Sequence, residues 1–215
     1  MTGLSPDFEQ RLEQILAYFN SKLVANGPTP GGVDWNSVES QTTRYRQILK
    51  VCDKDEKFSV IDYGCGYGGM IDYMSMNGYE FQYIGYDPLK SMIDMAQQLY
   101  RDRTDCSFTA DLDELQPADY LVSSGIFNIK LDIPAVEWTE YCLSVLNRMD
   151  SLSTKGFSFN MLTNYSDPER MRPDLYYADP LFFFDYCKRK FARNVALLHD
   201  YIIYDFTILV RKALD

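Results

Sequence analysis

Four glycines and an acidic residue stand together in FSVIDYGCGYGGM, residues 58–70. Gly64, Gly66 and Gly69 satisfy the spacing G-x-G-x-x-G, which lets a chain turn sharply and lets a ligand approach the backbone closely. Asp62, however, stands two places before the first glycine. A carboxylate there would repel a pyrophosphate by roughly 4 kcal/mol at about 4 Å and an effective dielectric near 20. The stretch therefore favours a ligand that carries positive charge.

Few other residues could do chemistry. His199 is the only histidine of the chain, and it follows a short apolar run. An imidazole can accept a proton near neutral pH, so His199 is the candidate general base, although His199 and Asp200 could equally form a turn. The five cysteines are scattered, odd in number and never spaced C-x-x-C. This pattern argues against disulfides and a zinc site, and it predicts a cytoplasmic protein without a metal.

The overall charge limits the possible partners. With 21 basic and 31 acidic residues among 215, the chain carries a formal net charge of −10, which repels phosphate backbones. We therefore expect no nucleic acid partner. The N-terminal sequence MTGLSPDFEQRLEQ lacks the features of a signal peptide, and no run of about 18 apolar residues occurs. We therefore expect no membrane span, while the oligomeric state stays open.

Hydrophobic periodicity indicates the elements that must position these residues. An apolar stripe at helical spacing runs from Phe8 to Leu23, and a second helix is expected from Trp35 to Val51. From residue 58 onward, short apolar runs alternate with helical patterns. The expected strands are 58–63, 82–86, 105–109, 118–123, 157–162, 194–198 and 201–210. The expected helices are 68–77, 89–101, 111–115, 135–150 and the segment DPLFFFDYCKRK.

This alternation predicts a doubly wound, Rossmann-like α/β fold. We expect a seven-stranded, mostly parallel sheet with helices on both faces. Only His199 and Asp200 separate the last two apolar runs, which predicts a tight antiparallel hairpin at the C-terminal end. We expect one domain, in which residues 1–52 form an N-terminal helical cap and residues 53–215 form the core.

Five segments occur along this pattern in a fixed order: VIDYGCGYGGM, YIGYDP, CSFTADLDEL, ADYLVSSGIFNI and KGFSFNML. In this order they resemble the motifs of class I S-adenosylmethionine-dependent methyltransferases, whose first motif is an acidic residue followed by x-G-x-G-x-G. The resemblance covers roughly residues 35–212. The implied cofactor carries an ammonium and a sulfonium, which suits the carboxylate of Asp62. A nicotinamide-dependent oxidoreductase remains an alternative, because the G-x-G-x-x-G spacing is also its fingerprint.

The resemblance implies a cofactor contact for each matching residue. Asp62 would bind the amino group, Asp87 the ribose hydroxyls and Asp111 the adenine amino group. Arg44, in the segment QTTRY, matches an arginine that reaches the carboxylate of the cofactor. Each of the four could instead cap a helix or lie on the surface. The other implied cofactor residues are Gly64, Cys65, Gly66, Tyr67, Gly68, Pro88, Leu112, Ser124, Gly125 and Phe127.

The resemblance also implies methyl transfer to an oxygen or nitrogen atom of an acceptor. The N/D-P-P-[YF] motif of similar nucleobase methyltransferases is absent, so we expect a small-molecule acceptor. The long segment LTNYSDPERMRPDLYYADP is typical of a binding loop or lid. Candidate acceptor contacts are Asn128, Asn164, Tyr165, Arg172, Tyr176, Tyr177 and Tyr201. A catalytically silent cofactor-binding protein is a further alternative, because no unmistakable acid or base is present.

Overall fold

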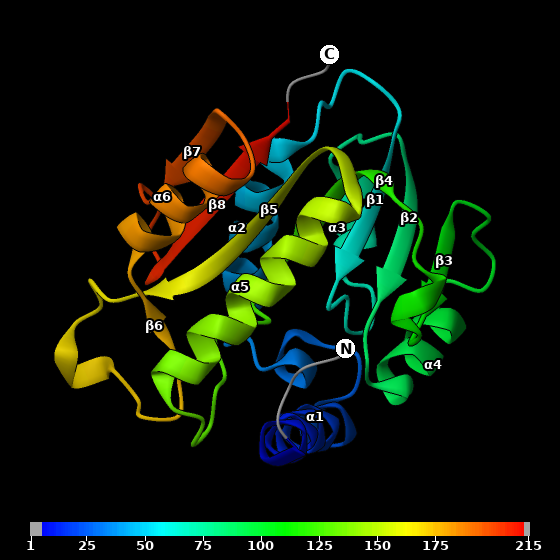
Figure 1. Ribbon diagram of the computed structural model, residues 1–215. Helices are drawn as coiled ribbons and strands as arrows, with labels where there is room; N and C mark the ends of the chain where they lie inside the picture. Colours follow the sequence, from blue (N-terminus) through cyan, green and yellow to red (C-terminus); the bar gives the residue numbers. More distant parts are fainter. Residues whose placement is uncertain (1–5, 213–215) are drawn as a thin grey trace.

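The computed structural model describes residues 6–212, and its centre is one eight-stranded sheet. Seven strands follow the order β3-β2-β1-β4-β5-β8-β7, and the short β6 pairs with β5 beside this path (Figure 1). β8 runs antiparallel to both of its neighbours, β5 and β7, whereas the other strand pairs among the described residues are parallel. The strands are β1 (Phe58–Tyr63), β2 (Phe81–Tyr86), β3 (Cys106–Thr109), β4 (Ala118–Ser123), β5 (Ser153–Thr163), β6 (Tyr177–Ala178), β7 (Asn194–Leu198) and β8 (Asp205–Arg211). The expected mostly parallel α/β fold is confirmed.

Helices cover both faces of this sheet. Trp138 of α5 and Phe183 of α6 pack in one buried apolar cluster with the sheet, whereas Ile48 of α2 and Met74 of α3 belong to a second cluster. Figure 1 accordingly shows α5 and α2 on opposite sides of β5. The helices are α1 (Pro6–Asn26), α2 (Val38–Ile48), α3 (Met70–Met76), α4 (Lys90–Leu99), α5 (Ala135–Ser151) and α6 (Pro180–Lys190). Residues 1–5 of the expected cap and 213–215 of the expected core lie outside the described part.

The strand order reverses beside β1. The chain proceeds from β1 to β2 and β3 on one side, and then returns to place β4 on the other side of β1. In open parallel sheets, ligands bind outside the carboxyl ends of the strands at such a reversal. The α1 helix lies below these strand ends in Figure 1. It is tied to α4 there by a hydrogen bond from Ser91 Oγ to Asn20 Oδ1 (2.9 Å).

The C-terminal hairpin is antiparallel as expected, but the prediction that it is tight is wrong. Residue 205 starts β8, and Leu198 pairs with Thr207, so a loop of residues 199–204 separates the two strands. Ile202 in this loop is fully exposed, and the hydroxyl of Tyr201 bonds with Thr207 Oγ1 (2.7 Å). The apolar residues 201–204 of this loop have high strand propensity, but they do not form a strand because no neighbouring strand pairs with them.

The helix expected at 111–115 is a single 3₁₀ turn, Leu112–Glu114. Asp111 caps this turn, because its Oδ1 accepts a hydrogen bond from the amide of Asp113 (2.9 Å). Within residues 6–212, no helix has the length and apolar character needed to cross a membrane.

Candidate active site

A cavity of about 570 Å³ opens at the carboxyl ends of β1, β2 and β4, where the strand order reverses. Its floor is the turn that follows β1, and α1 and α2 contribute further walls. Apolar side chains of α1 face it, namely Leu12, Ile15, Leu16 and Phe19. Its volume lies within the range of small-molecule and cofactor sites.

The glycine turn uses its own amides to fix its shape. The amides of Gly64 and Cys65 both donate to the carbonyl oxygen of Tyr86 (2.7 and 2.9 Å), and the amide of Gly66 donates to Asp87 Oδ2 (3.0 Å). Gly66 has a φ of 55°, and a Cβ there would lie 2.8 Å from Val33 Cγ1. Three amides that a pyrophosphate would need are therefore already hydrogen-bonded within the chain.

Asp62 is a buried carboxyl group at the end of β1, with 2% of the residue exposed. Burial raises the pKa of Asp62 to about 7, although a hydrogen bond from the Tyr83 hydroxyl (2.6 Å) lowers it and the nearby Asp87 raises it further. Within the described chain, no cationic side chain pairs with Asp62. A cationic ligand would supply the missing partner.

Asp87 lies just beyond β2 and is held by backbone amides. Oδ1 accepts from Leu89 N (2.9 Å), and Oδ2 accepts from Gly66 N (3.0 Å). A carboxylate offers about four lone-pair sites, so two remain for a ligand in the cavity that Asp87 lines. Burial raises the pKa of Asp87 to about 6, although these two hydrogen bonds lower it.

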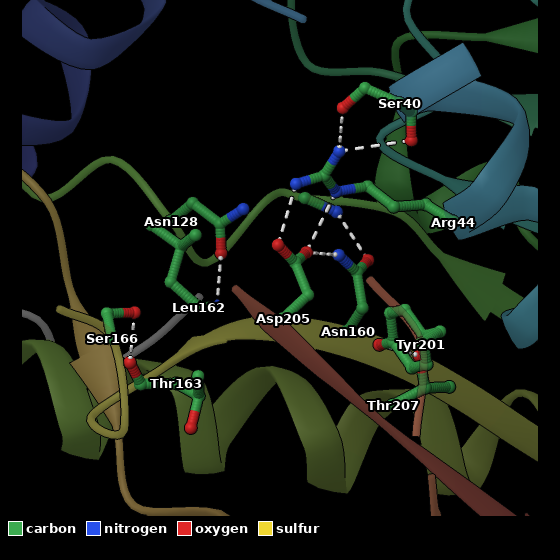
Figure 2. A network of polar contacts seen from close by, with 11 residues as sticks. Ser40, Arg44, Asn128, Asn160, Leu162, Thr163, Ser166, Tyr201, Asp205 and Thr207 are labelled. Carbon is green, nitrogen blue, oxygen red and sulfur yellow. Dashed lines mark hydrogen bonds and ion pairs between the residues drawn. The ribbon is translucent and has the colours of Figure 1, made fainter. Parts of the chain in front are cut away.

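Arg44 of α2 forms a buried ion pair with Asp205 of β8. Its Nε and Nη2 donate to the two carboxylate oxygens of Asp205 (2.8 and 2.6 Å), while Nη1 donates to the carbonyl and hydroxyl oxygens of Ser40. Figure 2 shows this fork together with Asn160, whose Nδ2 donates to Asp205 Oδ2 (2.5 Å). Arg44 lines the cavity, but its charge is neutralised within the chain.

The same network holds the loop that follows β4. Asn160 Oδ1 accepts a hydrogen bond from the amide of Gly125 (2.9 Å). Gly125 has a φ of 80°, and a Cβ there would lie 2.3 Å from the ring of Trp35. The guanidinium of Arg44 in turn lies 4.0 Å from the Trp35 ring centroid. One connected set of contacts thus fixes the cavity wall from α2 through β8 and β5 to the β4 loop.

The methyltransferase domain family matches residues 11–166 of the sequence. The chain belongs to this family. A curated relative from Mycobacterium tuberculosis (strain ATCC 25618 / H37Rv), "Putative methyltransferase Rv1506c", is 44% identical over 165 residues, which make up 77% of this chain and 99% of the relative. S-adenosylmethionine is the methyl donor of the family, so the suspected class I methyltransferase relationship is confirmed.

Solved methyltransferases share the fold at low sequence identity. The N-methyltransferase NodS from Bradyrhizobium japonicum WM9, in complex with S-adenosylhomocysteine, has a TM-score of 0.65 and 12% identity, covering 92% of this chain and 97% of NodS. Human N-acetylserotonin methyltransferase, in complex with S-adenosylmethionine, has a TM-score of 0.58 and 15% identity, covering 82% of this chain. This methyltransferase spans only 55% of the human chain.

The chemistry of the cavity fits the family's cofactor. Asp62 is a buried carboxyl group without a cationic partner in residues 6–212, and Asp87 keeps lone pairs for hydroxyl groups. The turn at Gly64 and Gly66 brings backbone to the cavity floor without side chains. Cations and hydroxyl groups can find partners here, whereas a pyrophosphate would meet two carboxyl groups and amides that are already bonded.

Most of the residues expected to contact the cofactor line the cavity. These are Arg44, Asp62, Gly64, Cys65, Gly66, Tyr67, Asp87, Pro88, Leu112, Ser124 and Gly125. Of the expected acceptor contacts, Asn128 and Arg172 line it as well. The side-chain oxygen of Asn128 accepts from Leu162 N (3.1 Å), as Figure 2 shows.

Three expected cofactor residues do not line the cavity. Phe127 is fully buried and packs against Phe159, so it belongs to the core. Gly68 turns toward Tyr100, whose ring a Cβ at Gly68 would meet at 2.9 Å. Asp111 is exposed and caps its own 3₁₀ turn.

The expected base His199 and the remaining acceptor candidates also lie outside the cavity lining. His199 lies directly after β7, at the edge of the sheet. Three strands, β4, β5 and β8, separate β7 from β1, so the two strands are about 19 Å apart at about 4.8 Å per strand spacing. Tyr176 bonds with Thr139, Tyr177 with the amide of Arg172, and Tyr201 with Thr207. Asn164 and Tyr165 are exposed beyond β5.

Sequence reasoning left parts of the cavity wall open and missed Gln41. The N-terminal helix was expected either to fold over the pocket mouth or only to pack on the core, and Trp35 either to close the pocket or to anchor its helix; α1 and Trp35 both line the cavity. Gln41, which was not among the expected residues, lines it as well. Gln41 stands one helical turn before Arg44 in the QTTRY segment, so the spacing i, i+3 could have indicated that both face the same way.

Proposed function

We propose that this methyltransferase moves a methyl group from S-adenosylmethionine to an oxygen or nitrogen atom of a small-molecule acceptor in the cavity between α1 and the strand ends. The observation that carries the proposal is Asp62, a buried carboxyl group that lines the cavity and has no cationic partner among residues 6–212. S-adenosylmethionine carries an ammonium that would complete this site. When bound, the cofactor supplies an activated methyl group on a positively charged sulfur.

In this proposal the residues of the chain bind and orient the cofactor. Asp62 pairs with the ammonium, and Asp87 accepts hydrogen bonds from the ribose hydroxyls through its two remaining lone-pair sites. The backbone at Gly64 and Gly66 supports the middle of the cofactor, and Leu112 contacts the adenine. The apolar face of α1 excludes water from the cavity, which keeps the acceptor aligned and desolvated.

The charges around the cavity favour an acceptor that is neutral or positively charged. Glu9 and Glu13 of α1 line the cavity, and neither forms an ion pair within the described residues. The cationic lining residues are already paired, Arg44 with Asp205 and Arg172 with Asp174. An anionic acceptor would therefore enter a negative cavity without finding a free cation. No histidine lines the cavity, which favours an acceptor such as an amine that reacts in its neutral form.

Calorimetry with the full chain tests the cofactor, and a methylation screen tests the acceptor. We expect S-adenosylhomocysteine to bind and to raise the melting temperature, and we expect no heat with NAD. Amines and alcohols should be methylated more readily than phosphates and carboxylates, as measured by release of S-adenosylhomocysteine. Binding of NAD without S-adenosylhomocysteine would instead support the oxidoreductase alternative. Tight cofactor binding with no turnover across the screen would support a catalytically silent protein.

A further inference from the structure

Gln41 presents an unsatisfied hydrogen-bond donor to the cavity. The residue is 5% exposed and lies on α2 one turn before Arg44. Its Oε1 accepts a hydrogen bond from the Tyr67 hydroxyl (3.3 Å), which orients the amide. Its Nε2 is buried and has no partner among the described residues. Because a buried amide donor without a partner is costly, Nε2 is expected to meet an acceptor on a ligand.

Ser124 provides a second unsatisfied group in the same cavity. Its Oγ is buried without a hydrogen-bond partner in the described structure, and the residue lies directly after β4. Gln41 and Ser124 are the two residues with such buried, unpartnered side-chain atoms in residues 6–212, and both line the cavity. The unsatisfied polar groups are thus concentrated where a ligand would bind.

Arg44 is poorly placed to receive an anion. Of its five N–H hydrogens, two point to Asp205 and two to Ser40, so Nη2 retains one. The carboxylate of Asp205 also neutralises its charge, so an arriving anion would meet an ion pair and not a cation. Arg44 instead connects α2 through Asp205 and Asn160 to the amide of Gly125.

Donors and an acceptor therefore line the same cavity. Gln41 Nε2 and Ser124 Oγ can donate to a carboxylate, and Asp62 can accept from an ammonium. The group that carries both a carboxylate and an ammonium on one carbon is an α-amino acid. S-adenosylmethionine ends in such a group.

We propose that Gln41, assisted by Ser124, binds the carboxylate of the amino-acid end of the cofactor, and that Arg44 is a positioning residue for the Gly125 loop. This inference rests on the proposed function, because it assigns contacts to the proposed cofactor. It departs from the contact that the resemblance implied for Arg44. Within the segment QTTRY, Gln41 then contacts the carboxylate of the ligand, and Arg44 positions the Gly125 loop of the cavity wall.

Two ligands that differ at the carboxylate test this assignment by calorimetry on the full chain. S-adenosylhomocysteine has the carboxylate, and decarboxylated S-adenosylhomocysteine lacks it. Gln41→Met keeps the size of the side chain and removes its polar atoms. It should weaken binding of S-adenosylhomocysteine roughly 10- to 100-fold and leave the decarboxylated ligand within about twofold.

Gln41→Glu sharpens the test because it gives opposite signs. Its carboxylate should repel S-adenosylhomocysteine and attract the cationic decarboxylated ligand, so the first affinity falls while the second rises. Gln47→Met is the matched control, since Gln47 is also a buried glutamine of α2 but does not line the cavity. It should leave both affinities unchanged. Apo melting temperatures of the three variants check that each is folded.

Three results separate the possible failures. Unchanged S-adenosylhomocysteine affinity in Gln41→Met would overturn the assignment. Equal weakening of both ligands would also overturn it, because the effect would then pass through Tyr67 and the glycine turn. Failure of the unmodified protein to bind either ligand would refute the proposed function itself, independently of Gln41.

Discussion

Two buried carboxyl groups on the sheet, Asp62 and Asp205, differ in what surrounds them. Asp205 begins β8, is fully buried, and accepts hydrogen bonds from Arg44 and Asn160. Asp62 accepts one hydrogen bond from Tyr83 and has no cationic partner within the described chain. The carboxylate of Asp205 is paired within the chain and connects α2 to β8, whereas we propose that a ligand supplies the partner of Asp62. The comparison contrasts a carboxylate that stabilises the fold with one that we assign to binding.

Breaking the completed pair should have the largest effect on stability. Asp205→Asn leaves the guanidinium of Arg44 buried without a counter-charge, which costs about 3–5 kcal/mol of unfolding free energy. Urea unfolding measures this loss. The control Asp185→Asn removes one partner of the exposed pair with Arg189 and should leave stability nearly unchanged. Equal losses of unfolding free energy in the two variants would mean that the buried pair stabilises the fold no more than the exposed pair does.

Removing a ligand-facing carboxylate should instead act on affinity. Asp87→Ala deletes the acceptor that we assign to the ribose hydroxyls, so S-adenosylhomocysteine should bind roughly 10- to 100-fold more weakly by calorimetry. Asp111→Ala is the control, because Asp111 is exposed and lies outside the cavity lining. Its affinity should stay within about twofold of the unmodified protein. A larger loss in Asp111→Ala than in Asp87→Ala would reverse the proposed cofactor orientation.

The unpaired carboxyl group should make apo stability depend on pH. The pKa of Asp62 in the folded protein, about 7, exceeds the value of about 3.9 in an unfolded chain. The folded state therefore holds this proton more tightly, and its contribution to unfolding free energy falls as pH rises from about 4 to 7. Asp62→Asn removes the contribution, so between pH 5 and 8 the variant should gain about 2 kcal/mol relative to the unmodified protein.

Urea unfolding of the apo protein at several pH values measures that relative gain. A constant difference between Asp62→Asn and the unmodified protein would show that Asp62 does not titrate in this range. For the same reason, we expect the affinity of the unmodified protein for S-adenosylhomocysteine to rise from pH 5 to 8, because the ammonium of the ligand binds the charged carboxylate of Asp62 more strongly than the neutral form. In Asp62→Asn this rise should disappear.

The smallest effect is expected at the edge of the sheet. His199 is exposed and lies outside the cavity lining, next to the rings of Tyr165 and Phe206. His199→Asn should therefore leave cofactor affinity and methyl transfer within about twofold, as measured by calorimetry and by product release. A drop of tenfold or more in turnover, with affinity unchanged, would restore a catalytic role for this residue.

The amino-acid sequence by itself determined the local parts of this protein. The boundaries of β1 and β4 match the expected strands, and β2 and β3 match them within one residue. The glycine turn, with Asp62 and Asp87 beside it, was also readable, because motif spacing records the shape of a short piece of chain. The direction of β8 followed from a connection too short for a crossover.

Only the tertiary structure decided which charges are paired and which face the cavity. Arg44 and Asp205 stand 161 positions apart in the sequence, and no local pattern indicates their contact. The same holds for His199, which a parallel strand places at the correct end of the sheet but at its far edge. The physical reason is that spacing determines local geometry, whereas the role of a charge depends on the distant side chains that burial brings around it.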